Sequence, residues 1–362
     1  RAAAGSTAGV TATAGAAGRA ATGEATVDPD AVADVGRVPH GGSDDPDLLD
    51  FSANTNPVRP AGVADAYEAA LDASTRYADD RPRFRAAAAD YVGCDPATVV
   101  PTPGGLAALR LAFGVTVGPD DRVAVPEPSF GEYAREIRLQ GGEPVGVAHD
   151  AILDVDPEDY AAVVVCTPNN PTGERPELGR LRDALADCRA ADTPLVVDEA
   201  FLDFTDAPGL AGERGAIVAR SLTKMFGLPG IRAGFAVATG DLGERIRAAR
   251  PAWSLSTPAA AVGRHCLEQT EFVERTRERV ASERERLRAA LAGPYDVFPS
   301  DAPFLLLNVG EASVDGVLRR ARGAGIALRD ARTFARLDSH VRVAVRRPHE
   351  NDRLLAALLD DR

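Results

Sequence analysis

Short apolar runs alternate with segments of helical period through the middle of the chain. The strand-like runs stand at 98–101, 122–125, 161–166, 194–197, 216–219 and 233–238. Most are separated by helical segments such as 106–113, 132–139 and 178–189. Buried strands joined by helices predict an α/β fold with a mostly parallel sheet covered on both faces. Ligands of such folds bind beyond the carboxyl ends of the strands.

The last third of the chain has a different pattern. Residues 259–292 predict one long helix, whose interleaved Glu and Arg form a solvated face. A strand at 304–309, a helix at 314–322, a strand at 341–345 and a closing helix from 351 follow. This order predicts a smaller α+β domain beside the large one. We expect the boundaries to be 1–37 for a flexible low-complexity tail, 38–75 for an N-terminal arm and part of the small domain, 76–253 for the large domain, and 254–362 for the connecting helix and C-terminal small domain.

Charge and composition exclude several classes of function. The net charge of −13 argues against nonspecific binding to nucleic acid or acidic membranes, which requires clustered positive charge. No run approaches the roughly 18 consecutive apolar residues of a transmembrane helix. The four cysteines are scattered, without the spacing of a metal site or a disulfide framework. We therefore expect a cytoplasmic protein with no bound metal.

Lys224 is the only lysine, and the remaining 40 of the 41 basic residues are arginine. Arginine stays protonated in proteins, so it cannot supply a neutral amine to attack a carbonyl. Lys224 lies between hydroxyl residues and an apolar, glycine-containing turn, within the stretch 221–232. By itself this context leaves two interpretations open: a leftover surface charge, or a nucleophile.

Three polar motifs directly follow strand-like runs. The first, TPGGL at 102–106, opens a helix whose free backbone N–H groups favour a phosphate. The second is PNNPTG at 168–173, and the third is DEAF at 198–201. A carboxylate at the end of a buried strand is costly unless it is paired, so Asp198 should face a cationic partner.

Two further motifs stand near the N-terminus. They are the His-Gly-Gly sequence that begins at His40 and the sequence DFSANTNP at 50–57. Consecutive glycines allow the backbone to approach a ligand closely, and Asn-rich segments ending in Pro form turns. An ordinary turn with a solvent-facing histidine is the alternative interpretation.

Taken in order, these motifs resemble the fold-type I enzymes that use pyridoxal 5′-phosphate, in the class I/II aminotransferase superfamily. The resemblance extends from about His40 over nearly the whole chain. It rests on Gly104-Gly105, 126–133, 170–173, 198–200, 221–232 and Arg342. It implies a three-layer aminotransferase fold of type I, in which 76–253 binds the cofactor, and a homodimer with shared active sites.

The resemblance also implies roles for individual residues. Lys224 and Asp198 are the catalytic residues: Lys224 bonds to the cofactor aldehyde and carries the proton at the substrate's Cα, and Asp198 pairs with the pyridine nitrogen. Asn170 donates to the phenolic oxygen, and Phe130 stacks on the ring, with Tyr133 as the other aromatic candidate. The residues that hold the cofactor phosphate are Gly105, Leu106, Ser221, Thr223, Arg232 and, from the partner subunit, Tyr77.

Within the superfamily the N-terminal motifs are most similar to those of the L-threonine-O-3-phosphate decarboxylases of cobalamin biosynthesis, and next to those of histidinol-phosphate aminotransferases. Phe201 and the sequence at 341–351 fit the decarboxylases. This resemblance implies that the substrate is a small phosphorylated amino acid. The enzyme would convert it to CO2 and (R)-1-aminopropan-2-yl phosphate. The residues expected to contact it are His40, Gly41, Asn54, Tyr133, Arg329 and Arg342.

Three departures from the family pattern are visible. Phe201 stands where many of these enzymes have a tyrosine, Leu106 and Ala107 replace hydroxyl or acidic side chains, and the segment 43–49 is shorter than in the decarboxylases. An aminotransferase and a non-catalytic α/β binding protein are the alternatives. The sequence has neither a Gly-x-Gly-x-x-Gly dinucleotide motif nor a Gly-Lys-Ser/Thr phosphate loop, and Lys224, Asp198 and Asn170 are intact, which argues for an enzyme.

Overall fold

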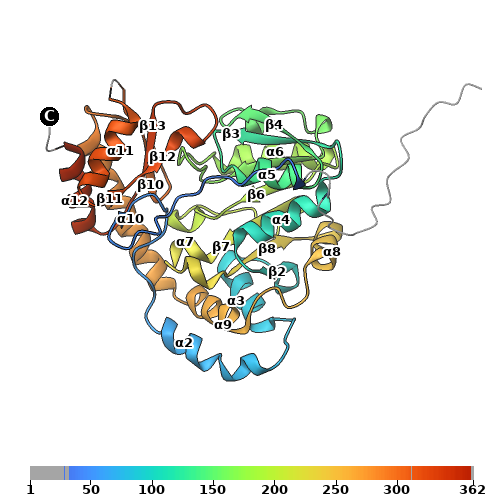
Figure 1. Cartoon of the computed structure of the whole chain (residues 1–362). Helices are drawn as coiled ribbons and strands as arrows, with labels where there is room; N and C mark the ends of the chain where they lie inside the picture. The colour runs from blue at the N-terminus through green and yellow to red at the C-terminus, as the bar shows by residue number, and fades with distance from the viewer. Residues whose placement is uncertain (1–27, 29–31, 311, 360–362) are drawn as a thin grey trace, which may run out of the picture.

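The computed structural model of the chain describes Asp28 and residues 32–310 and 312–359 (Figure 1). Most of the predicted tail at 1–37 lies outside these residues. The part that is described contacts the helix Glu132–Leu139, which covers the large sheet: the amide of Asp28 donates to the carbonyl of Leu139 at 2.8 Å. Within the described ranges, no helix is both long and apolar enough to cross a membrane.

A seven-stranded sheet forms the centre of the molecule (Figure 1). Its strands, in spatial order, are β2 (Val99–Thr102), β8 (Gly234–Ala238), β7 (Ala216–Ser221), β6 (Leu195–Asp198), β5 (Ala162–Cys166), β3 (Arg122–Glu127) and β4 (Glu143–Ala148). Only β8 runs antiparallel to its neighbours. The predicted α/β fold with a mostly parallel sheet is confirmed, and the edge strand β4, whose residues are only partly buried or exposed, is an addition.

Both faces of this sheet are covered, as its apolar strands require. Along β5, Val163 and Val165 belong to one buried cluster, whereas Val164 belongs to another on the opposite face. Full burial of each such side chain contributes about 1.5–3 kcal/mol. The covering helices are α3 (Pro82–Val92), α4 (Gly105–Thr116), α5 (Glu132–Leu139), α6 (Leu178–Ala190) and α8 (Gly240–Ala249).

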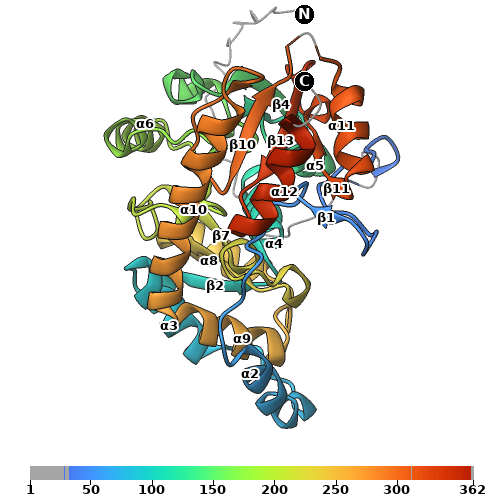
Figure 2. The same cartoon turned by 90° about the vertical axis from the view of Figure 1, so that its left-hand side faces the viewer.

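The C-terminal region builds a smaller, antiparallel sheet with helices beside it (Figure 2). Its strands are β12 (Arg329–Asp330), β13 (His340–Ala344), β10 (Phe304–Asn308) and β9 (Asp296–Val297), and its helices are α11 (Val314–Gly323) and α12 (Pro348–Leu359). Strand β1 (Leu49–Asp50) pairs with β11 (Ile326–Ala327). The N-terminal arm is thereby joined to the C-terminal region, while the exact domain boundaries stay a prediction.

The prediction of one long helix at 259–292 is wrong. The segment forms two helices, α9 (Thr257–Leu267) and α10 (Thr270–Leu291), separated at Glu268 and Gln269. Helix α9 packs on α2 (Val63–Ala69) and α3, whereas α10 packs on α12 and β10 (Figure 2). The chain changes direction because the two apolar faces have different partners.

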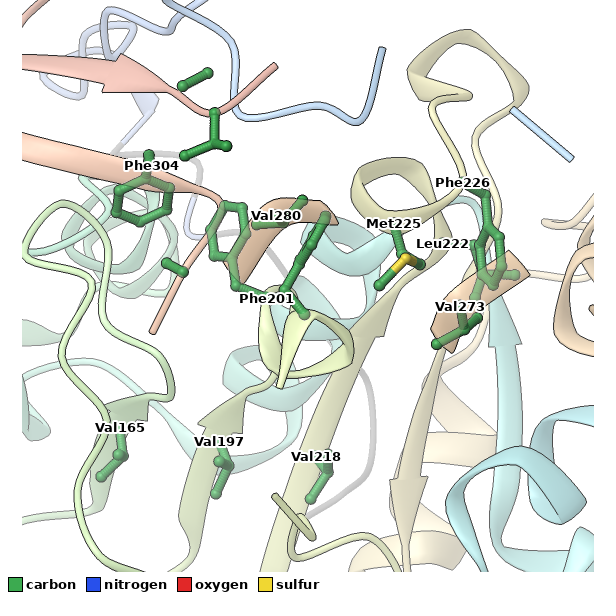
Figure 3. Close-up of a cluster of buried hydrophobic side chains, with 14 of the residues drawn as sticks. Val165, Val197, Phe201, Val218, Leu222, Met225, Phe226, Val273, Val280 and Phe304 are labelled. Atoms are coloured by element: carbon green, nitrogen blue, oxygen red, sulfur yellow. The ribbon is translucent and has the colours of Figure 1, made fainter. Parts of the chain in front are cut away.

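An apolar cluster joins the two sheets just beyond the ends of the strands (Figure 3). Phe201, which follows β6, meets Phe304 of β10 edge to face, with ring centroids 5.2 Å apart. Val280 of α10 and Met225, which follows β7, belong to the same buried cluster. This packing fixes the smaller sheet relative to the larger one beside the polar motifs.

Candidate active site

Four strands of the large sheet end on its same edge, and polar residues stand at or just beyond those ends. Strand β2 ends at Thr102, β5 at Cys166, β6 at Asp198 and β7 at Ser221. These four strands run in the same direction, so the motifs that follow them lie next to one another. The sheet topology thus collects the sequence motifs in one place.

Lys224 lies on α7 (Leu222–Met225), a single helical turn that follows β7. Its ammonium nitrogen is 5.8 Å from the centre of the Phe201 ring. Burial and, next, the nearby charge of Arg342 lower the pKa of Lys224 from its ordinary 10.5 to about 8, against the opposing effect of Asp198. A substantial fraction of neutral, nucleophilic amine is therefore present close to neutral pH.

Asp198 is a buried carboxylate, only 6% exposed, at the end of β6. It accepts hydrogen bonds from the hydroxyl of Tyr133 at 2.6 Å and from the backbone N–H of Ala200 at 3.0 Å. Burial raises the pKa of Asp198, while these two donors and Lys224 oppose that change. A protonated pyridine nitrogen would supply the cationic partner that this carboxylate requires.

Tyr133 is placed differently from the expectation of a ring-stacking or substrate contact. Its side chain is fully buried on the inner side of α5, where its hydroxyl holds Asp198. Phe130 instead lines the cavity, and its ring meets that of Tyr133 at 85° with centroids 5.6 Å apart. We therefore correct the assignment: Tyr133 positions Asp198 and does not face the substrate.

A cradle for a phosphate lies between the start of α4 and the end of β7. Gly104 has a φ of 97°, and a Cβ there would lie 2.7 Å from a guanidinium nitrogen of Arg232. A Cβ on Gly105 would lie 3.0 Å from the Cβ of Ser221. The hydroxyls of Ser221 and Thr223 are 2.8 Å apart. Backbone N–H groups at the helix start, Leu106 included, thus stand beside hydroxyl donors, as an anion requires.

Arg232 closes one side of this cradle. Its backbone is left-handed, with a φ of 57°, and its guanidinium donates to the carbonyls of Pro229 at 3.2 Å and Pro103 at 3.4 Å. These are long contacts to neutral acceptors. The guanidinium therefore keeps its charge available for the phosphate.

Arg329 and Arg342 are direct cross-strand neighbours on β12 and β13. Both are buried, with 8% and 4% exposure. Burial lowers the pKa of each, and the charge of Arg329 adds to the effect on Arg342. Like charges on facing positions destabilise a sheet unless an anion lies between them.

The partners of these two guanidinium groups are neutral. Arg342 donates to the carbonyl of Ser52 at 2.9 Å and to the amide oxygen of Asn170. Arg329 donates to the carbonyl of Pro39 at 2.7 Å and to the hydroxyl of Thr333 at 2.8 Å. The Nε atoms of both arginines are buried without a partner. Neither arginine forms an ion pair with a carboxylate in the described part of the chain.

A cavity of about 180 Å³ brings half of the predicted site residues together. Its lining includes His40, Gly41, Asn54, Phe130, Asn170, Lys224, Arg329 and Arg342. Asn54 is 3% exposed and its amide oxygen has no partner, which marks a place for a ligand donor. Because Asn170 accepts from Arg342 through its oxygen, its nitrogen is left to donate to a ligand.

Several lining residues were not predicted as site residues, and three of them adjoin the two arginines. Ser52, Thr333 and Phe334 belong to the same cavity, and the Phe334 ring lies 5.3 Å from the Arg329 guanidinium and 5.6 Å from that of Arg342. The short helical turn Ala331–Thr333 brings Thr333 and Phe334 back beside Arg329. The four-residue separation of Arg329 and Thr333 was the only signal in the sequence.

The N-terminal motif reaches the mouth of the cavity. The Nε2 atom of His40 is 2.9 Å from a carboxylate oxygen of Glu132, and its ring is 5.7 Å from that of Phe130. A Cβ on Gly41 would lie 2.3 Å from the carbonyl oxygen of Ser52, so glycine is required there. The short segment 43–49 is therefore long enough to place His40 at the site.

Tyr77 is not brought to this site by a single chain. Its side chain is 86% exposed and packs against Trp253, with ring centroids 4.8 Å apart. It does not line the cavity that holds Lys224. The predicted contact of Tyr77 with a cofactor phosphate would need a second copy of the chain.

The residues present fit pyridoxal phosphate. The glycine cradle accepts a phosphate, the buried Asp198 accepts a cationic ring nitrogen, Asn170 has a free amide donor, and Lys224 supplies an amine of lowered pKa. Asn170 and Lys224 line one cavity together with Phe130, and Asp198 and the glycine cradle follow strands of the same sheet.

Comparisons with known proteins agree with this geometry. Residues 46–358 match the family described as aminotransferase class I and II. The chain is 34% identical to the threonine-phosphate decarboxylase of Salmonella typhimurium over 86% of its own length and 90% of that protein. It is 30% identical to histidinol-phosphate aminotransferase 2 of Archaeoglobus fulgidus, over 87% and 93% respectively.

The fold is also that of solved members. The structure of L-threonine-O-3-phosphate decarboxylase from Porphyromonas gingivalis superposes with a TM-score of 0.77 at 23% identity, covering 85% of this chain and 97% of that one. The match to the family extends over most of the chain, and the relatives are matched over most of their own lengths. The chain belongs to the class I and II aminotransferase family, and it is an enzyme that depends on pyridoxal phosphate.

Proposed function

We propose that this enzyme decarboxylates L-threonine O-3-phosphate to (R)-1-aminopropan-2-yl phosphate in cobalamin biosynthesis. The observation that carries the proposal is the pair of buried, cross-strand arginines, Arg329 and Arg342, which lack carboxylate partners among the described residues. The proposed substrate has two anionic groups, a carboxylate and a phosphate. One group for each guanidinium would neutralise a pair of charges that is otherwise costly to bury.

The roles of the residues follow from this placement. Arg342 clamps the carboxylate, while Arg329, His40 and Asn54 hold the phosphate. Because the substrate is held at both ends, these contacts set which bond at Cα stands perpendicular to the cofactor ring. Pyridoxal phosphate, when bound, supplies the electron-accepting ring that stabilises the electron pair of that breaking bond.

Decarboxylation then needs one proton transfer from the protein. The bond between Cα and the carboxylate breaks, CO2 leaves, and the electron pair stays at Cα. The side-chain nitrogen of Lys224 delivers a proton to that carbon, which completes the amine product. Tyr133 keeps Asp198 in place throughout, through the hydrogen bond of 2.6 Å.

Histidinol-phosphate aminotransfer is the second candidate, because a relative with that name is 30% identical to this chain. In that reaction the Cα–H bond would stand perpendicular, and Lys224 would remove the proton. Histidinol phosphate has a phosphate but no carboxylate, so it would leave one of the two buried arginines without an anion, and only the second substrate, 2-oxoglutarate, would pair with both. L-threonine O-3-phosphate carries both anionic groups in one molecule. This difference favours the decarboxylase assignment.

We further propose that the enzyme is a cytoplasmic homodimer with shared active sites. Tyr77 and Trp253 are large aromatic residues with 86% and 55% exposure, and their rings contact each other in a tilted arrangement. Exposed aromatic side chains of this kind are enriched at protein interfaces. In a dimer Tyr77 would reach the cofactor phosphate of the other subunit.

The two candidates are separated by a paired assay on the purified holoenzyme. One arm measures CO2 from L-threonine O-3-phosphate, and the other measures amino transfer from histidinol phosphate to 2-oxoglutarate. The proposal predicts CO2 release, with Lys224→Ala as the inactive control. Amino transfer without CO2 release would contradict it.

A further inference from the structure

The start of the N-terminal arm, together with the two residues before it (36–42), forms one wall of the substrate cavity although it is far in sequence from much of the site. In Figure 1 the dark-blue chain runs between α5 and the smaller sheet. The carbonyl of Gly36 accepts from Arg135 at 3.1 Å, and that of Pro39 accepts from Arg329 at 2.7 Å. The arm is therefore held by α5, which covers the large sheet, and by β12 of the smaller sheet. Its position depends on a few polar contacts.

Glu132 makes the contact that fixes the side chain of His40. It is the first residue of α5 and is only 4% exposed. One carboxylate oxygen lies 2.9 Å from Nε2 of His40, and the other lies 3.3 Å from Arg135. Since an ionised carboxylate only accepts hydrogen bonds, Nε2 of His40 must carry the proton. The Nδ1 atom is then the ring nitrogen left for a ligand.

The surroundings of the pair restrict the imidazole further. Phe130, two residues before Glu132, meets the His40 ring at 5.7 Å with an angle of 45° between the planes. Gly131 lies between them, and a Cβ there would be 2.7 Å from the side chain of Val38. The segment 130–132 thus contacts the arm at three successive positions.

We propose that Glu132 is a positioning residue for substrate recognition. It holds the imidazole of His40 at the mouth of the cavity through Nε2 and stabilises the imidazolium form, in which Nδ1–H donates to the phosphate of the substrate beside Arg329. This inference rests on the proposed function, because it takes the phosphate of L-threonine O-3-phosphate as the group that His40 contacts. A bonded and oriented imidazole loses less freedom on binding than a free one, so the pair strengthens substrate binding.

Glu136 offers a matched control one helical turn away. It is also buried, at 1% exposure, and it pairs with Arg110 at 2.6 Å and with Arg135 at 3.1 Å, but it makes no contact with His40. Glu132→Gln and Glu136→Gln therefore remove the same charge from the same helix. Only the first changes the partner of His40.

The first experiment measures steady-state kinetics of the holoenzymes with L-threonine O-3-phosphate. Because hydrogen bonds to charged groups are worth more than neutral ones, Glu132→Leu should raise KM by about 10-fold or more, with a much smaller change in kcat. Glu132→Gln, which keeps an acceptor, should recover part of this loss, and Glu136→Gln should match the wild type. If Glu132→Gln and Glu132→Leu leave KM unchanged, the proposal is overturned.

A double mutant tests whether Glu132 acts through His40. The Glu132→Leu/His40→Ala enzyme should be no worse than His40→Ala alone, whereas Glu136→Gln should show no coupling to His40→Ala. Additive losses from Glu132→Leu and His40→Ala would mean that Glu132 acts elsewhere. Equal thermal unfolding of the variants checks that folding is intact, and Glu132→Gln serves if Glu132→Leu does not fold.

A second experiment separates this inference from the proposed function. Inorganic phosphate is titrated into each holoenzyme by calorimetry, so the readout does not depend on which reaction is catalysed. Weaker binding in Glu132→Gln than in Glu136→Gln supports the positioning role even if L-threonine O-3-phosphate is not decarboxylated. Equal binding in the two variants overturns the inference, whichever substrate the enzyme uses.

Discussion

The cofactor side and the substrate side of this active site are built in different ways. On the cofactor side Asp198, Ser221 and the glycine cradle all stand at or just beyond the ends of neighbouring strands of one sheet. On the substrate side the cavity wall combines the N-terminal arm, residues 52–54 and two strands of the smaller sheet. Under the proposed function, the first side holds the cofactor and the second side contacts the substrate.

The two sides also differ in electrostatics. The cofactor side holds a buried carboxylate, Asp198, that already has two hydrogen-bond donors. The substrate side holds two buried guanidinium groups, each with an unpartnered Nε atom. Lys224 lies between them, and its pKa of about 8 reflects burial and the cation on one side against the anion on the other. Mutations on the two sides should therefore have separable effects.

The largest effect is expected at the residue that both sides share. Lys224→Ala should lower the rate by about 10³-fold or more, because it removes both the covalent attachment and the proton carrier. Lys224→Arg keeps the charge but supplies no neutral amine, so it should be equally inactive. Borohydride reduction followed by mass spectrometry should trap the cofactor on the wild type and on neither variant. A trapped adduct in Lys224→Ala would place the attachment elsewhere.

Breaking the substrate side should leave the cofactor side intact. Arg342→Leu removes one partner of a buried charged contact, which typically costs about 2–5 kcal/mol, so kcat/KM should fall by roughly 30-fold to several thousand-fold. The visible absorbance of the bound cofactor should not change. Loss of cofactor absorbance in this variant would show that the two sides are not separable.

A smaller effect is expected from Tyr133→Phe, a change on the cofactor side that leaves the residues around the cofactor phosphate in place. Tyr133→Phe removes the hydrogen bond to Asp198, worth about 1.5–3 kcal/mol for a charged group, and kcat should fall by roughly 10-fold to 100-fold. KM should change little, because Tyr133 does not line the cavity. Tyr160→Phe, which keeps the ring beside Arg122, is the control. A selective rise in KM would restore Tyr133 as a substrate contact.

The pH dependence of cofactor attachment gives the mildest test. The neutral amine of Lys224 is the reactive form, and with a pKa of about 8 its fraction rises about tenfold from pH 7 to pH 9 and then levels off. An ordinary lysine would still be gaining neutral amine above pH 9, with a rise of about a hundredfold over the same range. The rate at which the apoenzyme recovers visible absorbance with added cofactor distinguishes the two profiles.

The contrast between the two sides also explains what the sequence could predict. Each cofactor motif is a short continuous stretch that directly follows an apolar strand. The sheet topology alone therefore brings Asp198, Ser221 and Lys224 together. Arg329 and Arg342 lie side by side because of the register in which β12 pairs with β13. Strand β12 has only two residues and no apolar pattern. The roles of the two arginines came from the family resemblance, because no local signal specifies that register.

Two further differences have local causes. Tyr133 was expected at the ligand because it follows the Phe130 motif, but the phase of α5 turns it into the interior. Glu132 was missed because an acidic residue in the first turn of a helix is ordinarily explained by the helix dipole. The break at Glu268 and Gln269 carries neither glycine nor proline, so tertiary packing alone ends α9.

If the substrate side directs the cleavage of the bond between Cα and the carboxylate, turnover requires no amino acceptor. The holoenzyme is incubated with excess L-threonine O-3-phosphate and no 2-oxo acid, and CO2 is counted per active site. We expect many equivalents of CO2, with the cofactor still in its aldehyde form. At most one turnover without CO2, with the cofactor converted to its amine form, would contradict this expectation.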